Sequence, residues 1–286
     1  MRTVFYTLAA LIAFAGNSVL CRLALGDESI DASSFTSIRL ISGAVVLLII
    51  VSLRKSVPLI PLKGSIKGSF LLFLYAVSFS FAYVSLDTAT GALILFAAVQ
   101  LTIILVTLYS GHRFHISEWF GLIISFIGFV YLVMPSVQSP PLFGSVLMTI
   151  SGIAWAGYTL LGKASTTPLF DTLGNFSRTI PFALVMLMLT IYDAQISQKG
   201  VILAVLSGSI ASGVGYTIWY MALNGLSATQ AAVVQLLVPI LAAFGGVIFV
   251  GEQVSSRLVI SSLLVLGGIL IVVMGRNYFT KQHDSE

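Results

Sequence analysis

The sequence predicts an all-α membrane protein of ten transmembrane helices, arranged as two inverted five-helix repeats. Three observations lead to this prediction: the composition, the length of the apolar runs and an internal repeat. Of the 286 residues, 58% are hydrophobic and only 8% are charged, whereas soluble domains carry about 25% charged residues. So few charges leave too little polar surface for a water-soluble globule, and most of the outer surface must therefore face lipid.

The apolar runs are continuous and long enough to cross about 30 Å of hydrocarbon as α-helix. They cover Val4–Leu23, Ser34–Leu53, Gly68–Leu86, Gly91–Tyr109, Ser117–Met134, Phe143–Leu161, Thr172–Tyr192, Val201–Leu223, Thr229–Val250 and Leu258–Met274. The first run continues beyond any signal-peptide cleavage site near Ala15, so we expect a retained helix. Because no soluble domain fits between the runs, any function must reside in the membrane bundle.

The distribution of positive charge predicts the orientation in the cell inner membrane. With the N-terminus inside, nine Lys and Arg residues face the cytoplasm and three face outward, which places both termini in the cytoplasm. The inner set is Arg2, Arg54, Lys55, Lys63, Lys67, Arg113, Lys163, Arg276 and Lys281, and the outer set is Arg22, Lys199 and Arg257. The net charge of +4 thus reflects topology, and we expect no nucleic-acid partner.

An internal repeat divides the chain into residues 1–136 and 137–286. Its matched segments keep their order in both halves: Ser37-Ile38-Arg39-Leu40-Ile41 with Phe176-Ser177-Arg178-Thr179-Ile180, Ala82-Tyr83-Val84-Ser85-Leu86 with Trp219-Tyr220-Met221-Ala222-Leu223, and Val99-Gln100-Leu101 with Val234-Gln235-Leu236. A unit of five helices crosses the membrane an odd number of times, so its second copy enters from the opposite side. Inverted repeats of this kind are typical of secondary transporters.

Four features together resemble one known family. A basic residue closes the first helix of each half, and an arginine lies early in each second helix. The stretch Gln235-Leu236-Leu237-Val238-Pro239 is followed by Gly251-Glu252. With the two five-helix halves, these features resemble the EamA family of the drug/metabolite transporter superfamily, and within it the YddG-like amino-acid exporters. The resemblance implies a ten-helix transporter with a central cavity that exports amino acids or related metabolites.

Candidate substrate-binding residues are amphipathic side chains that lie deep within spans of both halves. They are Phe79, Tyr83, Phe96, Gln100, Trp155, Tyr158, Trp219 and Tyr220. Trp and Tyr prefer a site where the polar tip is wet, which in mid-membrane means a cavity, and packing against lipid is the alternative. An uncharged aromatic cavity of this kind should favour neutral and aromatic amino acids.

Four further polar residues are candidates for structural or gating roles. Arg39 and Arg178 are expected near the membrane interface or paired with a carboxylate, and contact with a substrate carboxylate is the alternative. Asn17 and Gln235 are expected to form hydrogen bonds between helices, and a place on the cavity wall is the alternative.

The sequence also argues against other function classes. The acidic residues Asp87, Asp171, Asp193, Glu118 and Glu252 lie at span ends or in loops, so no membrane-embedded carboxylate is expected to carry protons. The single cysteine and the lack of HExxH, Gly-x-Ser-x-Gly or nucleotide-binding motifs predict no metal, no cofactor and no intramembrane enzyme. Export of another substrate class, such as nucleotide sugars, lipids or drug-like compounds, remains an alternative, and a monomer is expected.

Overall fold

The computed structural model describes residues 2–53, 63–110, 116–134, 139–226, 230–231 and 234–283, with side chains for all of these except 117, 118, 133 and 272–283. Arg54, Lys55 and Arg113, and the side chains of Glu118, Arg276 and Lys281, therefore lie outside the described residues. So do Thr229, Ala232 and Val233 of the predicted ninth run.

The described chain is helical throughout, and its β-structure is limited to one isolated bridge between Ile30 and Ile196. The first half contains α1 (Arg2–Leu25), α2 (Ala32–Ser52), α3 (Ile66–Tyr83), α4 (Thr88–Tyr109) and α5 (Ile116–Val133). The second half contains α6 (Leu142–Gly162), α7 (Pro168–Thr190), η1 (Ile191–Asp193), α8 (Gln198–Leu206), η2 (Ser207–Val214), α9 (Gly215–Leu223), α11 (Leu237–Gly245), η3 (Gly246–Val250) and α12 (Ser256–His283).

The outer surface of the bundle is apolar. Seven helices are long and apolar enough to span a membrane, and three shorter apolar helices accompany them among the described residues. Large apolar side chains such as Phe5, Phe244 and Leu263 are 63–70% exposed, an arrangement that would be unfavourable in water and is expected in lipid. The prediction of an all-helical membrane protein is confirmed.

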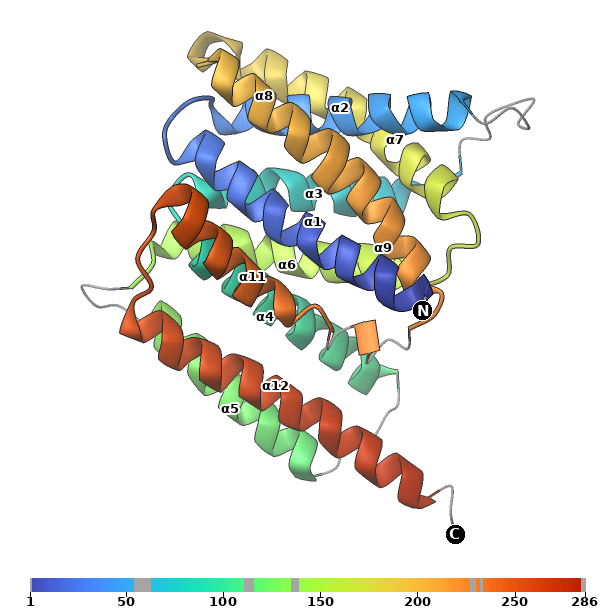
Figure 1. Ribbon diagram of the computed structural model, residues 1–286, viewed down its shortest axis with the longest axis vertical. Helices are drawn as coiled ribbons and strands as arrows, with labels where there is room; N and C mark the ends of the chain where they lie inside the picture. The colour runs from blue at the N-terminus through green and yellow to red at the C-terminus, as the bar shows by residue number, and fades with distance from the viewer. Residues whose placement is uncertain are drawn as a thin grey trace.

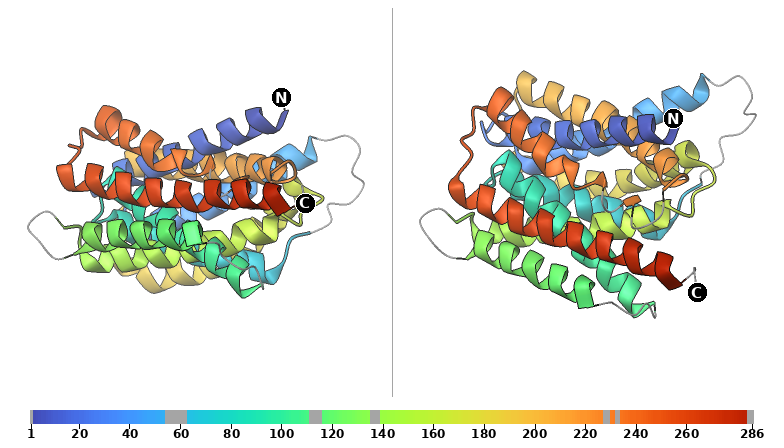
Figure 2. Two further views of the ribbon diagram at one scale, coloured as in Figure 1. Left: turned by 90° about the horizontal axis from the view of Figure 1, so that it is seen from below. Right: turned by 60° about the horizontal axis from the view of Figure 1, so that its bottom comes forward.

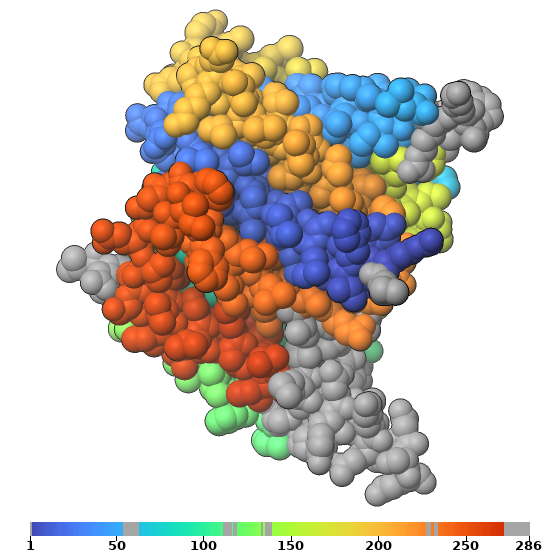
Figure 3. Space-filling view, viewed as in Figure 1, coloured from blue at the N-terminus to red at the C-terminus, as the bar shows by residue number. Residues whose placement is uncertain are grey.

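Helices from the two halves pack against each other throughout the bundle. The pairs α2 with α7, α4 with α11 and α5 with α12 each join one helix from either half. In addition, α1 packs against α9 and α11, while α6 packs against α3 and α4. Figure 1 shows α5 and α12 side by side at one edge, and the views in Figure 2 keep them together. Figure 3 shows α1 on one face, between the α8–α9 segment and α11.

The bundle has two ends, which we name by one residue each. The Lys63 end holds the start of α1, residues 63–65 and residues 163–167, and the Asp87 end holds residues 26–31, 84–87, 193–197 and 251–255. Side-chain caps begin several helices at these ends, because Ser, Thr and Asp oxygens accept from otherwise unpaired backbone N–H groups. Asp31 accepts from Ser34 N at 2.9 Å, and Ser65 accepts from Gly68 N at 2.9 Å.

The predicted eighth span, Val201–Leu223, is not one regular α-helix. It begins as α8, widens into the π-helical segment η2 and continues as α9. Gly208 in η2 lies so close to α2 that an added Cβ would stand 2.1 Å from the backbone oxygen of Arg39. Glycine and serine let the two helices approach, and the π-helical turn shifts the direction of every side chain that follows.

Candidate functional site

Arg39 on α2 lies in the interior of the bundle, where its side chain is only 1% exposed. Its Nε donates to Ser212 Oγ at 3.1 Å, and its Nη2 donates to the hydroxyls of Tyr216 at 2.7 Å and Tyr75 at 3.2 Å. Nη1 is buried and has no hydrogen-bond partner. Ser212 and Tyr216 are four residues apart and belong to η2 and α9, so the π-helical turn helps to place both beside the guanidinium.

The environment of Arg39 corrects the expectation of an interfacial arginine paired with a carboxylate. The ion pairs found among the described residues involve Arg22 and Lys199 with acidic partners, all at the Asp87 end. The Arg39 guanidinium is stabilised instead by neutral hydroxyls and by ring faces, with Cζ 5.2 Å from the Tyr75 centroid and 5.0 Å from that of Phe79. The expectation of an uncharged interior is therefore also wrong.

A chain of hydrogen bonds extends from Arg39 to α1. Tyr216 OH donates to Tyr75 OH at 3.0 Å, and Asn17 Nδ2 donates to the same hydroxyl at 3.3 Å. Ser207 Oγ donates to Asn17 Oδ1 at 2.6 Å. The predicted interhelical role of Asn17 thus has a specific form: it joins α1 and α3 of the first half to η2 of the second.

Trp155 on α6 forms the centre of an aromatic cluster beside this network. Its ring lies 4.7 Å from Tyr216, 5.0 Å from Tyr75 and 5.2 Å from Phe14, measured between centroids. Its indole N–H donates to Gln235 Oε1 at 3.1 Å. Aromatic faces, hydroxyls and one cation therefore converge from both halves of the chain. Such a combination can hold a small molecule that has an apolar part and a polar head.

All eight predicted substrate-binding residues are buried inside the bundle, at exposures of 0–2%, so none of them packs mainly against lipid. Phe79 lies 5.2 Å from Tyr75, and Tyr158 lies 5.6 Å from Trp155. These two residues border the central cluster directly.

Of the other predicted residues, Trp219 also borders the cluster, through Phe14. Trp219 packs on Phe14 at 5.5 Å, and Tyr220 packs on Tyr158 at 5.1 Å and donates to its carbonyl. Tyr83 lies towards the Asp87 end, where its hydroxyl donates to Thr88 O at 3.2 Å. Phe96 and Gln100 are buried on α4.

Arg178, which matches Arg39 in the repeat, has a different environment. Its Nη1 donates to Lys63 O at 2.6 Å and to Gly174 O at 3.1 Å. It therefore fastens α7 to the segment before α3 at the Lys63 end, which agrees with a structural role. The repeat predicts both arginines early in a helix, but α7 begins at Pro168, so Arg178 lies near its middle; the environment of each arginine depends on the neighbouring helices.

Sequence reasoning missed Tyr75, Ser207, Ser212 and Phe14 as members of the cluster, and it assigned no site role to Tyr216. The run of small residues from Ser207 to Gly215 was the available signal, because such a run permits close helix approach and irregular turns.

A second polar group lies at the Asp87 end. Glu252, in the loop after η3, accepts from Arg22 Nε at 3.3 Å, from Thr88 N at 2.9 Å and from Thr88 Oγ1 at 3.0 Å. Arg22 also lies 3.5 Å from Asp87. Gly251 adopts a left-handed φ of 76° that favours glycine and turns the chain so that Glu252 reaches these partners. One carboxylate therefore joins the end of α1, the start of α4 and a loop of the second half.

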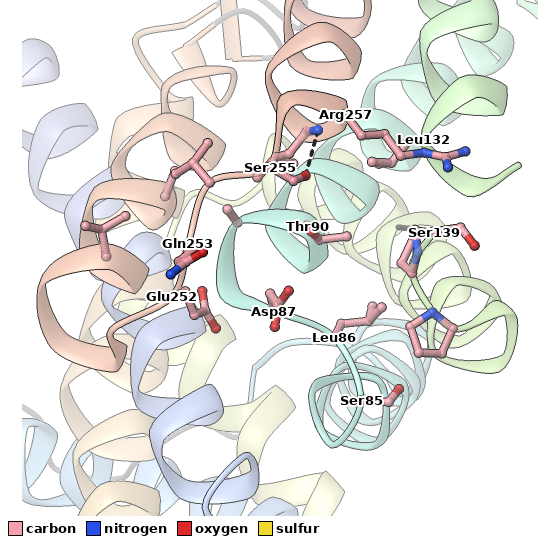
Figure 4. A pocket seen from close by; sticks show the side chains of 17 residues that line it. Ser85, Leu86, Asp87, Thr90, Leu132, Ser139, Glu252, Gln253, Ser255 and Arg257 are labelled. Carbon is pink, nitrogen blue, oxygen red and sulfur yellow. Dashed lines mark hydrogen bonds between the residues drawn. The ribbon is translucent and has the colours of Figure 1, made fainter. Parts of the chain in front are cut away.

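This group borders a cavity of about 320 Å³. Figure 4 shows the segments that surround it, with Asp87 and Glu252 among the labelled side chains. Its lining comes from the loops before α4, before α6 and before α12, and from residues of α4, α5, α11, η3 and α12. Asp87 and Glu252, two of the carboxylates expected at span ends, thus lie beside this cavity and not in the central cluster.

Comparison with known proteins identifies the family. The sequence model of the EamA-like transporter family matches residues 1–134 and again residues 142–274. A Pseudomonas aeruginosa protein described as uncharacterized is 46% identical over 275 residues, which cover 96% of each chain. The Escherichia coli "Probable amino-acid metabolite efflux pump" is 25% identical over 240 residues, covering 78% of this chain and 79% of that protein.

Two further comparisons agree with this assignment. The Bacillus subtilis "Uncharacterized transporter YoaV" is 22% identical over 259 residues and covers 86% of this chain and 89% of its own. A solved crystal structure shares the fold with a TM-score of 0.64 at 16% identity, over 93% of this chain and 97% of that chain. Since the family model covers most of the sequence, the chain belongs to the EamA-like transporter family and is a multi-pass membrane transporter.

Proposed function

We propose that the protein exports small metabolites, with neutral and aromatic amino acids as the favoured substrates, by alternating access through the centre of the bundle. The observation that carries the proposal is the buried cluster around Trp155 and Arg39, which combines aromatic faces with polar groups from both halves. Inverted-repeat transporters bind substrate near the midplane, between their repeats. The E. coli relative described as an amino-acid metabolite efflux pump supports the substrate class.

The proposal includes ten spans in two inverted repeats, residues 1–136 and 137–286. The helix packing supports it: α2 with α7, α4 with α11 and α5 with α12 are pairs of equivalent helices, and the contact of α1 with α9 has its counterpart in that of α6 with α3. The two successive matches of the family model are a second support. Two similar halves can exchange inward-open and outward-open arrangements at small energetic difference.

The contacts of Glu252 suggest how one arrangement is held. The Arg22–Glu252 pair and the two bonds from Thr88 join the halves at the Asp87 end. Substrate passage at this end requires that the loop after η3 move away from α1 and α4. We therefore assign this group the role of a clasp that closes the Asp87 end.

We further propose that the Lys63 end faces the cytoplasm of a cell with the protein in its inner membrane. Lys67 is exposed near that end, and Lys199 is 57% exposed near the other. In intact cells, a membrane-impermeant maleimide should label a Lys199→Cys variant and not a Lys67→Cys variant, both in a Cys21→Ala background. Labelling of the Lys67→Cys variant alone would show that the Lys63 end faces outward, opposite to the proposed orientation.

The proposed function is tested by counterflow in liposomes that contain the purified protein and are loaded with single amino acids. We expect uptake of labelled phenylalanine or another large neutral amino acid, driven by the same amino acid inside, and little uptake of glutamate. Uptake of nucleotide sugars or lipids, with no amino acid exchanged, would overturn the proposal.

A further inference from the structure

The Arg39 guanidinium is a buried cation without a counter-ion among the residues that the structure describes. Its Nη1 atom has no partner, and the groups around its other nitrogens are the hydroxyls of Tyr75, Tyr216 and Ser212. Arginine cannot shed its charge at physiological pH. Removal of such a charge from water costs several kcal/mol unless an anion and further hydrogen bonds compensate for it.

Hydroxyls compensate for this charge only in part, because each is neutral. Each hydroxyl is a hydrogen-bond donor as well as an acceptor, so a rotated hydroxyl can donate to an anion held by the guanidinium. The hydroxyls of Tyr75 and Tyr216 lie 3.0 Å apart and both contact Nη2. One unpaired guanidinium nitrogen and two adjacent hydroxyls therefore form a set of donors at the end of the Arg39 side chain.

We propose that Arg39 is the receptor for the carboxylate group of the transported substrate. The guanidinium fork matches the two oxygens of a carboxylate, and a single cation at this position suits a single negative charge. Ionisable groups within membrane spans mark substrate pathways for the same energetic reason. The inference rests on the proposed function, since it names the chemical group that the central cluster recognises.

The neighbouring side chains complete the description of the ligand. The rings of Phe79 and Trp155 both pack on Tyr75, so an apolar or aromatic part would lie beside the carboxylate. The amide oxygens of Asn17 and Gln235 are acceptors, at present engaged by Ser207 and Trp155, that an ammonium group could share. The expected ligand is therefore a small monocarboxylate with an apolar body, and an α-amino acid satisfies every part of this set.

The test compares ligands that differ from phenylalanine either at the carboxyl group or at the amino group. The purified full-length protein, in detergent, is titrated with phenylalanine, with its carboxamide, which lacks the carboxylate charge, and with 3-phenylpropionate, which keeps the carboxylate and lacks the amino group, and binding is followed by tryptophan fluorescence. A charge-assisted hydrogen bond is worth about 1.5–3 kcal/mol, so phenylalanine should bind about 10- to 150-fold more tightly than its amide. Comparable affinities for acid and amide in the wild-type protein, or no binding of either carboxylate, would overturn the inference.

Arg39→Gln should remove this preference, so that phenylalanine and its amide bind with similar affinity. Arg178→Gln is the matched control, because Arg178 occupies the equivalent place in the repeat but lies at the Lys63 end, and the preference should persist. If the Arg39→Gln variant does not fold, the inference is tested by the affinities of the wild-type protein and by the Arg39→Lys variant. We expect the Arg39→Lys variant to keep a reduced preference for phenylalanine over its amide. If the role of Arg39 is purely structural, the Arg39→Gln substitution will lower the melting temperature and leave the preference for the acid over the amide intact.

The two proposals can fail separately. Counterflow without any amino-acid exchange, together with Arg39-dependent binding of 3-phenylpropionate, would overturn amino-acid export and retain the carboxylate site. Amino-acid exchange that proceeds equally well in the Arg39→Gln variant would retain the transport function and overturn the role of Arg39.

Discussion

The Trp155→Phe substitution tests whether the aromatic cluster is a binding site or only packing. A phenyl ring keeps most of the contacts with Phe14, Tyr75 and Tyr216, but it cannot donate to Gln235. Both partners of this hydrogen bond are buried, at 2% and 0% exposure. The lost bond and the buried acceptor left behind cost about 1–2 kcal/mol, which corresponds to a factor of about 5–30.

We expect the counterflow rate for phenylalanine to fall by about this factor, measured at equal protein abundance in liposomes. The control is Trp119→Phe on α5, where the side chain is 44% exposed and the rate should not change. Adding Gln235→Leu to Trp155→Phe should restore part of the melting temperature that the single substitution loses, because removal of both partners leaves no unpaired buried acceptor. Equal rates for the Trp155→Phe and Trp119→Phe variants would refute the assignment of Trp155 to the site.

Two further predictions concern the clasp and the helix contact beside the site. Glu252→Gln loses the charge that pairs with Arg22, at 3.3 Å. We expect a water-soluble maleimide to label an Ala89→Cys reporter about fivefold faster, because a loss of about 1 kcal/mol of stabilisation of the closed arrangement corresponds to about this factor. An unchanged labelling rate would contradict the clasp. Gly208→Ala places a Cβ 2.1 Å from the α2 backbone, so the melting temperature in detergent should fall by several degrees, in keeping with an overpacking cost of about 1–3 kcal/mol. Gly16→Ala, with no atom within 4 Å of the added Cβ, should melt like the wild type, and equal melting of the two variants would contradict the close approach of η2 and α2.

The depth of the aromatic residues could be predicted because it depends mainly on position along a span. Trp155 and Tyr158 lie within an apolar run, and both are buried in the bundle. The burial of Tyr75 and Phe14 in the same cluster could not be predicted, since their neighbours in sequence resemble those of many lipid-facing aromatics. Which face of a span turns inward depends on its packing partners, and an apolar sequence with little amphipathic pattern does not specify that face.

The contrast between Arg39 and Arg178 shows that the sequence does not specify the packing partners of a polar residue either. Both lie in the second helix of a repeat, and the local sequences around them are similar. Arg39 meets η2 and α9, whose π-helical turn brings Ser212 and Tyr216 towards it, whereas Arg178 meets the backbone at Lys63. A repeat conserves the position on a helix, but small differences in the facing helix decide whether an arginine is central or peripheral.

By itself, the sequence determined that the chain is helical, embedded in a membrane and free of acidic residues at the centre of its apolar runs, because each of these properties follows from local composition. Only the tertiary structure decided which side chains meet, since the decisive contacts join residues far apart in the chain: Arg39 with Tyr216, Trp155 with Gln235 and Arg22 with Glu252. Helix packing is controlled by small residues and close approach, and a hydrogen bond forms only where that packing brings donor and acceptor within about 3 Å of each other. The spans can therefore be predicted from the order of the residues, whereas the site arises from the packing of the spans.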